Sequence, residues 1–235
     1  MIMLLRSNVS GDIKSKNNNC GFTVIELLVA LVISGVVMAG VIQLFAIQVK
    51  THNAQFAVSS LQQNMRSSMD YMIRFARMSG YDPGFVGAGF QSALANSLDF
   101  TRDVGTLSGG AVDTTPNGII DDHWDEKIIF RLNSSSGRLE RVKANGTPVL
   151  VADNIEALNF RYLDSLGNDT STVTDIRSVQ ITMVGRTSPL SGIMPRFTNT
   201  TTYRNQRGDT LLPAQNDSVR RMMLTAEVRC RNLNR

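Results

Sequence analysis

The chain has 235 residues and a formal net charge of +4 at pH 7. This length, with one long apolar segment near the start, leaves enough chain for one globular domain of ordinary size. The modest net charge favours neither a nucleic-acid-binding protein nor a protein that acts on strongly acidic substrates, but the charge is unevenly distributed. Residues 81–184 carry 14 acidic and 8 basic side chains, whereas residues 185–235 carry 3 acidic and 9 basic ones. We therefore expect one head with a polarised charge distribution.

The apolar segment follows a single carboxylate, Glu26. Residues 27–49 carry no formal charge, and a helix of that length rises roughly 35 Å, which is enough to cross a bilayer core. A carboxylate in a lipid-exposed helix costs roughly 2.5–3.5 kcal/mol on insertion scales. We therefore expect Glu26 to have a partner, or else to reach the membrane interface.

The polar, basic stretch "RSNVSGDIKSKNNNCG" precedes the apolar segment. A secretory signal has its apolar stretch before the cleavage site. Here the order is reversed, so a cut after Gly21 would leave the hydrophobic helix on the mature protein.

"GFTVIELLVALVI" resembles the N-terminal methylation motif of type IV prepilins and pseudopilins. The resemblance implies that residues 1–21 form a leader, that a prepilin peptidase cuts between Gly21 and Phe22, and that Phe22 is then N-methylated. Glu26 corresponds to the carboxylate inside the membrane. We interpret it as a docking charge for the free amine that cleavage creates at Phe22 of another subunit.

Beyond Lys50 the helix becomes amphipathic. Apolar side chains recur at helical spacing with polar ones between them; they are Leu61, Met65, Met69, Met72, Ile73 and Ala76. Gly80 and the following "YDPG" form a stop signal. We expect residues 22–49 to form a transmembrane and filament-core helix, and residues 50–80 to form its amphipathic half.

Residues 81–235 have the pattern of a β head. Five segments show strand-like composition and alternate apolar with polar residues; they are residues 127–132, 138–142, 155–164, 176–184 and 222–228. This alternation predicts an antiparallel sheet with one face covered by the amphipathic half of the helix. Two long loops are expected, at residues 82–125 and 185–220.

The head also resembles PilW-type minor pilins and the related J-type minor pseudopilins of type II secretion, in "LQQNMRSSMDYMIRFARMSGYDP", "VADNIEALNFRYLD" and "IRSVQITMVGRT". The resemblance implies an α+β type IV pilin fold and a single-pass inner-membrane protein with a periplasmic head, which later joins an extracellular pilus of a Gram-negative bacterium. It also implies three partners: the prepilin peptidase, other major and minor pilins, and an inner-membrane assembly platform.

Signals for catalysis or cofactors are weak. The chain has two histidines, His52 and His123, at no metal-binding spacing, and no glycine-framed serine, so we expect no enzyme activity. "DTTPNGIIDDHWDE" places four oxygen donors around Gly118 like the start of a calcium loop; they are Asp113, Thr115, Asn117 and Asp121. Trp124 stands where such a loop needs its last acid. We expect a solvated acidic loop without a cofactor, and keep calcium as the alternative.

The cysteines favour a minor subunit, because many major pilins of the family that the motif resembles close a C-terminal loop with an intrachain disulfide. Cys20 leaves with the leader, so Cys230 remains alone and cannot form an intrachain disulfide. A buried thiol is expected, with an intersubunit bridge as the alternative.

Three functions fit these patterns. The first is a minor pilin that helps to initiate or cap a type IV pilus, and the second is a minor pseudopilin at the tip of a type II secretion system. The third is a DNA-binding subunit in natural transformation, for which the basic end of the chain would contact phosphates. Nucleic acid is the least favoured partner because the acidic middle of the chain can neutralise these arginines; they are Arg186, Arg196, Arg204, Arg207, Arg220, Arg221, Arg229, Arg231 and Arg235.

Overall fold

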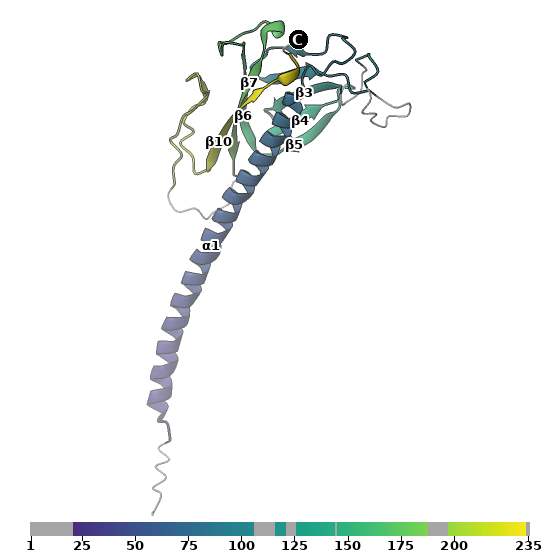
Figure 1. Cartoon of the computed structure of the whole chain (residues 1–235). Helices are drawn as coiled ribbons and strands as arrows, with labels where there is room; N and C mark the ends of the chain where they lie inside the picture. The colour runs from purple at the N-terminus through teal and green to yellow at the C-terminus, as the bar shows by residue number, and fades with distance from the viewer. Residues whose placement is uncertain (1–20, 106–115, 121–125, 144, 188–196, 234–235) are drawn as a thin grey trace, which may run out of the picture. The chain divides into compact units, whose positions relative to one another are not determined.

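A computed structural model of the chain describes residues 21–105, 116–120, 126–143, 145–187 and 197–233. The chain divides into two compact units, Met1–Gln48 and Val49–Arg235, and the helix α1 (Val24–Arg77) contributes to both. The other elements follow in chain order in Figure 1: β1 (Phe90–Ser92), β2 (Ser97–Thr101), β3 (Lys127–Asn133), β4 (Arg138–Val142), β5 (Pro148–Ala152), β6 (Ile155–Leu163), the 3-10 helix η1 (Val173–Asp175), β7 (Ser178–Arg186), β8 (Tyr203–Arg204), β9 (Thr210–Leu212), β10 (Arg221–Arg229) and the 3-10 helix η2 (Arg231–Leu233).

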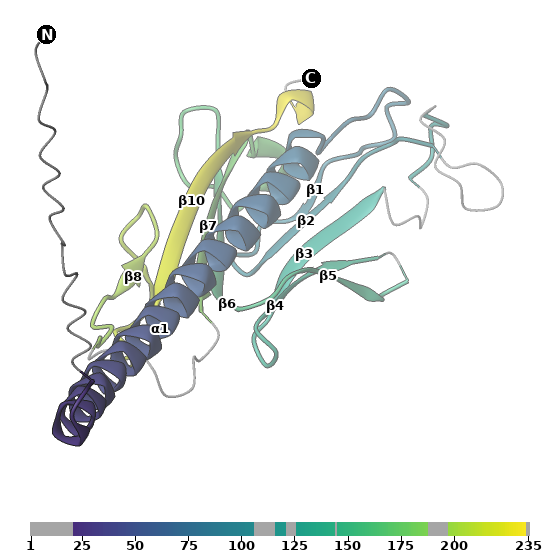
Figure 2. The same ribbon diagram turned by 90° about the horizontal axis from the view of Figure 1, so that it is seen from below.

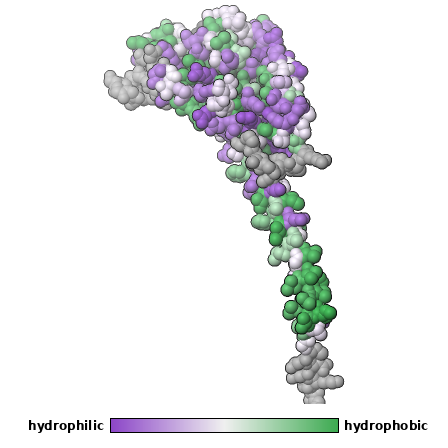
Figure 3. Space-filling model, turned by 180° about the vertical axis from the view of Figure 1, so that it is seen from behind, coloured by the Kyte–Doolittle hydropathy of each residue, from purple (hydrophilic) through white to green (hydrophobic). Residues whose placement is uncertain are grey.

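The first unit contains the apolar part of α1. Its side chains are exposed in the single chain, and they form an apolar surface around the helix (Figure 3). Among the described residues, α1 is the one helix long and apolar enough to cross a membrane. A helix that is apolar on most sides needs lipid or other helices around it, because exposing such a large apolar surface to water is unfavourable.

The part of α1 in the second unit carries the predicted apolar stripe. Leu61, Met65, Met69, Met72 and Ala76 are buried, and Ile73 packs against the same core. The helix ends as predicted, because Gly80 adopts a φ of +69°, which favours glycine. A Cβ atom at Gly80 would also lie 2.2 Å from Cδ2 of Leu233.

The first sheet of the head has five antiparallel strands in the order β1-β2-β3-β4-β5. The β3–β4 hairpin, whose two strands were predicted from the sequence, pairs Leu132 with Leu139, and its turn contains Gly137 at a φ of +67°. Leu98, Phe100, Ile128, Phe130 and Leu139 are completely buried.

The second sheet has three antiparallel strands in the order β10-β7-β6. The central strand β7 pairs Ile181 with both Phe160 of β6 and Ala226 of β10. Residues 178–185 of β7 are all buried, so both faces of its first eight residues are covered. In the second unit, α1 lies between β10 on one side and β1, β2 and β3 on the other (Figure 2).

The two sheets meet along β6. The β6 amide of Phe160 donates to the carbonyl oxygen of Ala95 at 2.8 Å, and the amide of Ile155 donates to that of Gly137 at 2.9 Å. The Tyr162 hydroxyl also donates to the carbonyl oxygen of Ser97 at 2.7 Å. The hairpin ends of the first sheet therefore abut the edge of the second sheet.

These elements confirm the predicted α+β class, with a long N-terminal helix and antiparallel β structure. The prediction of a single sheet was wrong, because the head has two sheets and a short ribbon formed by β8 and β9. The two expected long loops contain β1, β2, β8 and β9, and β5 was not predicted. These five strands have two to five residues each, which is too short for an alternating pattern to stand out.

Candidate assembly site at the start of the apolar helix

The start of α1 brings Thr23 and Glu26 together. Thr23 precedes the first helical residue, and its hydroxyl oxygen accepts a hydrogen bond from the Glu26 amide at 3.2 Å. In return, the Glu26 carboxylate accepts from the Thr23 amide at 3.0 Å and from the Thr23 hydroxyl at 3.1 Å. This reciprocal pair is a capping box, which satisfies amides that the first helical turn leaves without partners.

The capping box gives Glu26 a partner within its own chain. Thr23 was missed by sequence reasoning, although the T-x-x-E spacing from Thr23 to Glu26 is a sequence signal for this arrangement. Gly21 and Phe22 lie just before the helix, and the Phe22 side chain is 91% exposed. The cut between Gly21 and Phe22, the methylation of Phe22 and the docking role of Glu26 stay predictions.

Beyond Glu26, α1 carries no charge up to Lys50, and its surface there is mostly apolar. Its one serine in this stretch, Ser34, donates its hydroxyl hydrogen to the carbonyl oxygen of Ala30 at 2.7 Å. That hydroxyl therefore needs no further partner. Glu26 is the only formal charge in residues 22–49, so any charge-based recognition along this stretch depends on it.

The candidate calcium loop is described only in part. Asp113, Thr115 and Asp121 lie outside the described residues. Asn117 is described, and its side-chain oxygen accepts a hydrogen bond from the Ile119 amide at 2.9 Å. In the described ranges, no three histidine, cysteine or acidic side chains are arranged to hold a metal ion. Calcium binding by this loop therefore stays untested.

Two buried carboxylates near that loop, Asp103 and Glu126, accept hydrogen bonds from backbone amides. Asp103 accepts hydrogen bonds from the amides of Asn117 and Gly118 at 3.2 and 3.1 Å. Glu126 accepts from the amides of Val104 and Gly105 at 3.2 and 2.9 Å. Both side chains are fully buried. Sequence reasoning noted Glu126 only as an acid that follows Trp124, and it did not predict a structural role for either acid.

Cys230 is free and buried, which confirms the expected buried thiol. Burial raises its pKa to about 11, because the thiolate would be desolvated. The thiol therefore stays protonated near neutral pH, and this position favours packing over reactivity.

The basic end of the chain is partly neutralised within the head. The Arg221 side chain is 2% exposed, and it contacts Glu156 at 2.5 Å and Asp217 at 2.6 Å. Arg207 contacts Asp169 at 2.9 Å, and Asp169 also pairs with Arg161. Arg196 and Arg235 lie outside the described residues. Arg221 and Arg207 therefore already have acidic partners, as the charge distribution predicted.

Comparison with known proteins supports the N-terminal assignment. Residues 16–42 match the family model of the prokaryotic N-terminal methylation motif, which confirms the motif predicted from the sequence. Among solved structures, the chain is similar to the type IV-like pilin TTHA1219 from Thermus thermophilus, with 16% identity over 74% of this chain and 97% of that chain, and a TM-score of 0.49. No curated protein matches it. The chain thus carries the methylation motif on a helix that is long and apolar enough to span a membrane.

Proposed function

We propose that this protein is a minor pilin, a structural subunit that helps to initiate or cap a type IV pilus. One observation carries the proposal: within the methylation motif, Glu26 precedes an exposed helical stretch, residues 27–49, that carries no charge. Such a helix suits two successive environments, the bilayer before assembly and a bundle of similar helices afterwards. The head would be periplasmic and later extracellular, and the role is structural rather than catalytic.

Assembly in this proposal depends on one charge pair. A prepilin peptidase in the inner membrane removes residues 1–21 and exposes the amine of Phe22. In a helical filament, the amine of one subunit meets Glu26 of its neighbour, where the low dielectric constant strengthens their attraction. The pair sets the axial register of the helices. The other partners are major and minor pilins and the inner-membrane assembly platform.

A minor pseudopilin of a type II secretion tip complex is the second candidate, because the same helix and motif serve both machines. The PilW-type resemblance of the head favours a minor subunit in either case, and so does the lack of an intrachain disulfide partner for Cys230 once Cys20 has left with the leader. A DNA-binding subunit in natural transformation is less favoured, because Arg221 and Arg207 already have acidic partners.

A deletion in the source bacterium separates these candidates. We expect loss of surface pili, with secreted enzymes at wild-type levels. Loss of secreted enzymes with normal pili would instead identify a pseudopilin. DNA binding by the purified protein that weakens steeply with added salt would support the third candidate.

A further inference from the structure

Residues 197–219, which we call the strap, bond mainly with one another. The strap contains the ribbon of β8 and β9, a separate hairpin beside the second sheet (Figure 2). At its base, the Asn199 amide donates to the carbonyl oxygen of Asp217 at 2.7 Å, and the Asn216 amide donates to that of Asn199 at 2.9 Å. In the described part of the chain, each backbone-to-backbone hydrogen bond of a strap residue has its partner inside the strap. The strap is therefore attached to the described sheets through side chains.

The strap adds little to the hydrophobic core. Within this fully described segment, Asn199 is the one buried residue, and the two leucines of β9 are half-buried. None of the strap residues belongs to, or packs against, the described core cluster. β9 lies against β6, and the Asn205 side-chain amide donates to Oδ1 of Asn159 in β6 at 3.2 Å. A segment with few buried apolar contacts opens at a lower free energy than the elements of the core.

Charge pairs hold the strap at both ends. At the base, Nη1 and Nη2 of Arg221 donate to Asp217 at 2.6 and 2.7 Å, and Arg221 also bonds to Glu156 of β6. At the tip, Arg207 contacts Asp169 at 2.9 Å. The Arg221 side chain is 2% exposed, whereas that of Arg207 is 61% exposed. The pair at the tip is therefore the weaker one, because water and salt screen an exposed ion pair.

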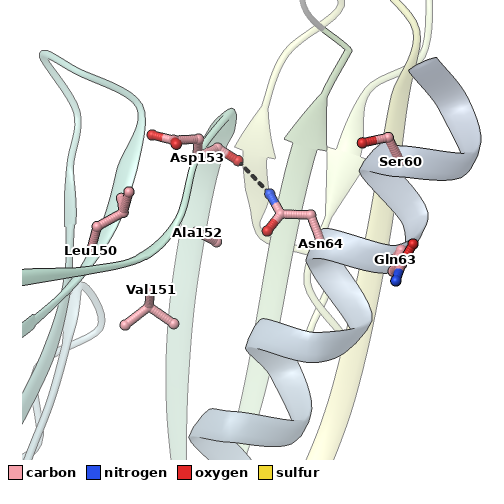
Figure 4. A pocket seen from close by; sticks show the side chains of 7 residues that line it. All are labelled: Ser60, Gln63, Asn64, Leu150, Val151, Ala152 and Asp153. Carbon is pink, nitrogen blue, oxygen red and sulfur yellow. Dashed lines mark hydrogen bonds between the residues drawn. The ribbon is translucent and has the colours of Figure 1, made fainter. Parts of the chain in front are cut away.

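The elements around the strap are held together by other contacts. β10 pairs with β7 along its whole length, from Arg221 to Arg229. In α1 the Asn64 side-chain amide donates to the carbonyl oxygen of Asp153 at 3.0 Å, beside the pocket that the helix forms with residues 150–153 (Figure 4). These contacts involve no strap residue, so they persist when the strap moves.

We propose that the strap is a hinged flap, whose tip opens from β6 while both sheets stay folded, and that the Arg207–Asp169 pair is its clasp. The buried bonds between Arg221 and Asp217 keep the base of the strap in place and make it the hinge. Once released, the hairpin of β8 and β9 loses its protection, because a two-stranded hairpin on its own is marginally stable in water.

Opening changes the polar groups that this face of the head presents. In the closed strap, Asn205 donates to Oδ1 of Asn159, and Arg207 contacts Oδ2 of Asp169. Opening frees both of these acceptor oxygens, while Arg161 keeps its bond to the other oxygen of Asp169. The open and closed forms therefore differ in the hydrogen-bonding groups exposed beside β6.

Hydrogen–deuterium exchange of the full-length protein in detergent, measured by mass spectrometry, tests this flap. We expect the amides of residues 203–212 to be protected about 100-fold less than those of β7. Arg207→Gln should speed exchange in the strap about threefold, because it removes the exposed ion pair, and should leave β7 unchanged. Arg204→Gln is the matched control. Arg204 lies in the same hairpin and donates within the strap, to the carbonyl oxygen of Gly208 at 2.8 Å, so exchange should stay nearly unchanged.

Salt supplies an independent readout. Raising the NaCl concentration from about 0.05 to about 0.5 M should speed strap exchange about twofold in wild type and in Arg204→Gln, because it screens the exposed pair. Arg207→Gln should show no such response, since the pair is absent and the buried pair at the base is screened much less. Equal protection of the strap and β7, equal effects of the two substitutions, or a salt response that survives in Arg207→Gln would overturn the inference.

Discussion

Glu26 takes part in two interactions that can be separated by substitution. In the single chain its carboxylate accepts hydrogen bonds from Thr23, and in the proposed filament its charge attracts the Phe22 amine of a neighbour. Along the helix, the next basic residue after Glu26 is Lys50, 24 positions away, and Lys16 on the other side leaves with the proposed leader. A partner for the charge must therefore come from another chain or from the cleaved N-terminus.

Glu26→Gln isolates the charge, because glutamine also forms a capping box. We expect normal membrane levels, since the neutral side chain inserts at least as readily. Co-purification with partner pilins should fall about tenfold or more, and piliation of a deletion strain should not be restored. Thr23→Val is the matched control, which removes the hydroxyl of the cap and keeps the charge. Full restoration of filaments by Glu26→Gln would show that the docking charge is unnecessary.

Arg221 stabilises the head through charge. Its hydrogen bonds to Asp217 hold the pKa of that carboxyl below its usual value, so the interaction stabilises the fold above the unfolded pKa of about 4 and is lost as the pH falls through the lower folded value.

We expect Arg221→Gln to lower the free energy of unfolding at pH 7 by about 1–3 kcal/mol, because the buried guanidinium makes charge-assisted hydrogen bonds to Glu156 and Asp217. The deficit should shrink as the pH falls below about 4, the unfolded pKa, and through the lower pKa that Asp217 has in the folded protein. Denaturant unfolding of the purified protein at a series of pH values measures this. The exposed Arg204 supplies the control Arg204→Gln, and a deficit that does not depend on pH would contradict the assignment.

At the level of elements, α1 approaches β7 closely at Gly185. A Cβ atom at this glycine would lie 2.6 Å from Sδ of Met65 and 2.9 Å from Cδ1 of Leu61. The missing side chain therefore allows the helix to pack directly on the strand.

Gly185→Val should lower the free energy of unfolding by about 1–3 kcal/mol through overpacking. Met65→Ala removes the side chain in the way, at its own cost of about 2–5 kcal/mol for the lost burial. Combining the two changes should cost less than the sum of the single changes by at least about 0.5 kcal/mol. Strict additivity in denaturant unfolding would show that these two sites are not in contact in the folded protein.

The acidic loop around Gly118 allows one further prediction. We expect isothermal titration calorimetry of the purified protein with calcium to show no binding, because Trp124 occupies the position of the last acidic ligand. Heat of binding that disappears in Asp113→Ala would contradict this expectation. An unchanged signal in that variant would place the calcium elsewhere.

For the whole molecule, strong periodic patterns predicted most of the architecture. The helical stripe from Leu61 to Ala76 and the alternation in β6 correspond to buried faces, whereas β7 is buried on both faces and β10 is mostly half-buried. The division into two sheets could not be predicted, because it depends on contacts such as that between Phe160 and Ala95, which are far apart in the sequence. The motif singled out Glu26, whereas the strand β5 has no signature beyond a short apolar run.

In the proposed function, this chain is cut at the methylation motif and assembled through its new N-terminus. Intact-mass analysis of filaments purified from the source bacterium is the decisive measurement. We expect a chain of 214 residues that begins with methylated Phe22, and Gly21→Leu should leave an uncut precursor in the inner membrane. A filament subunit that retains Met1 would show that the chain is not cut at the motif.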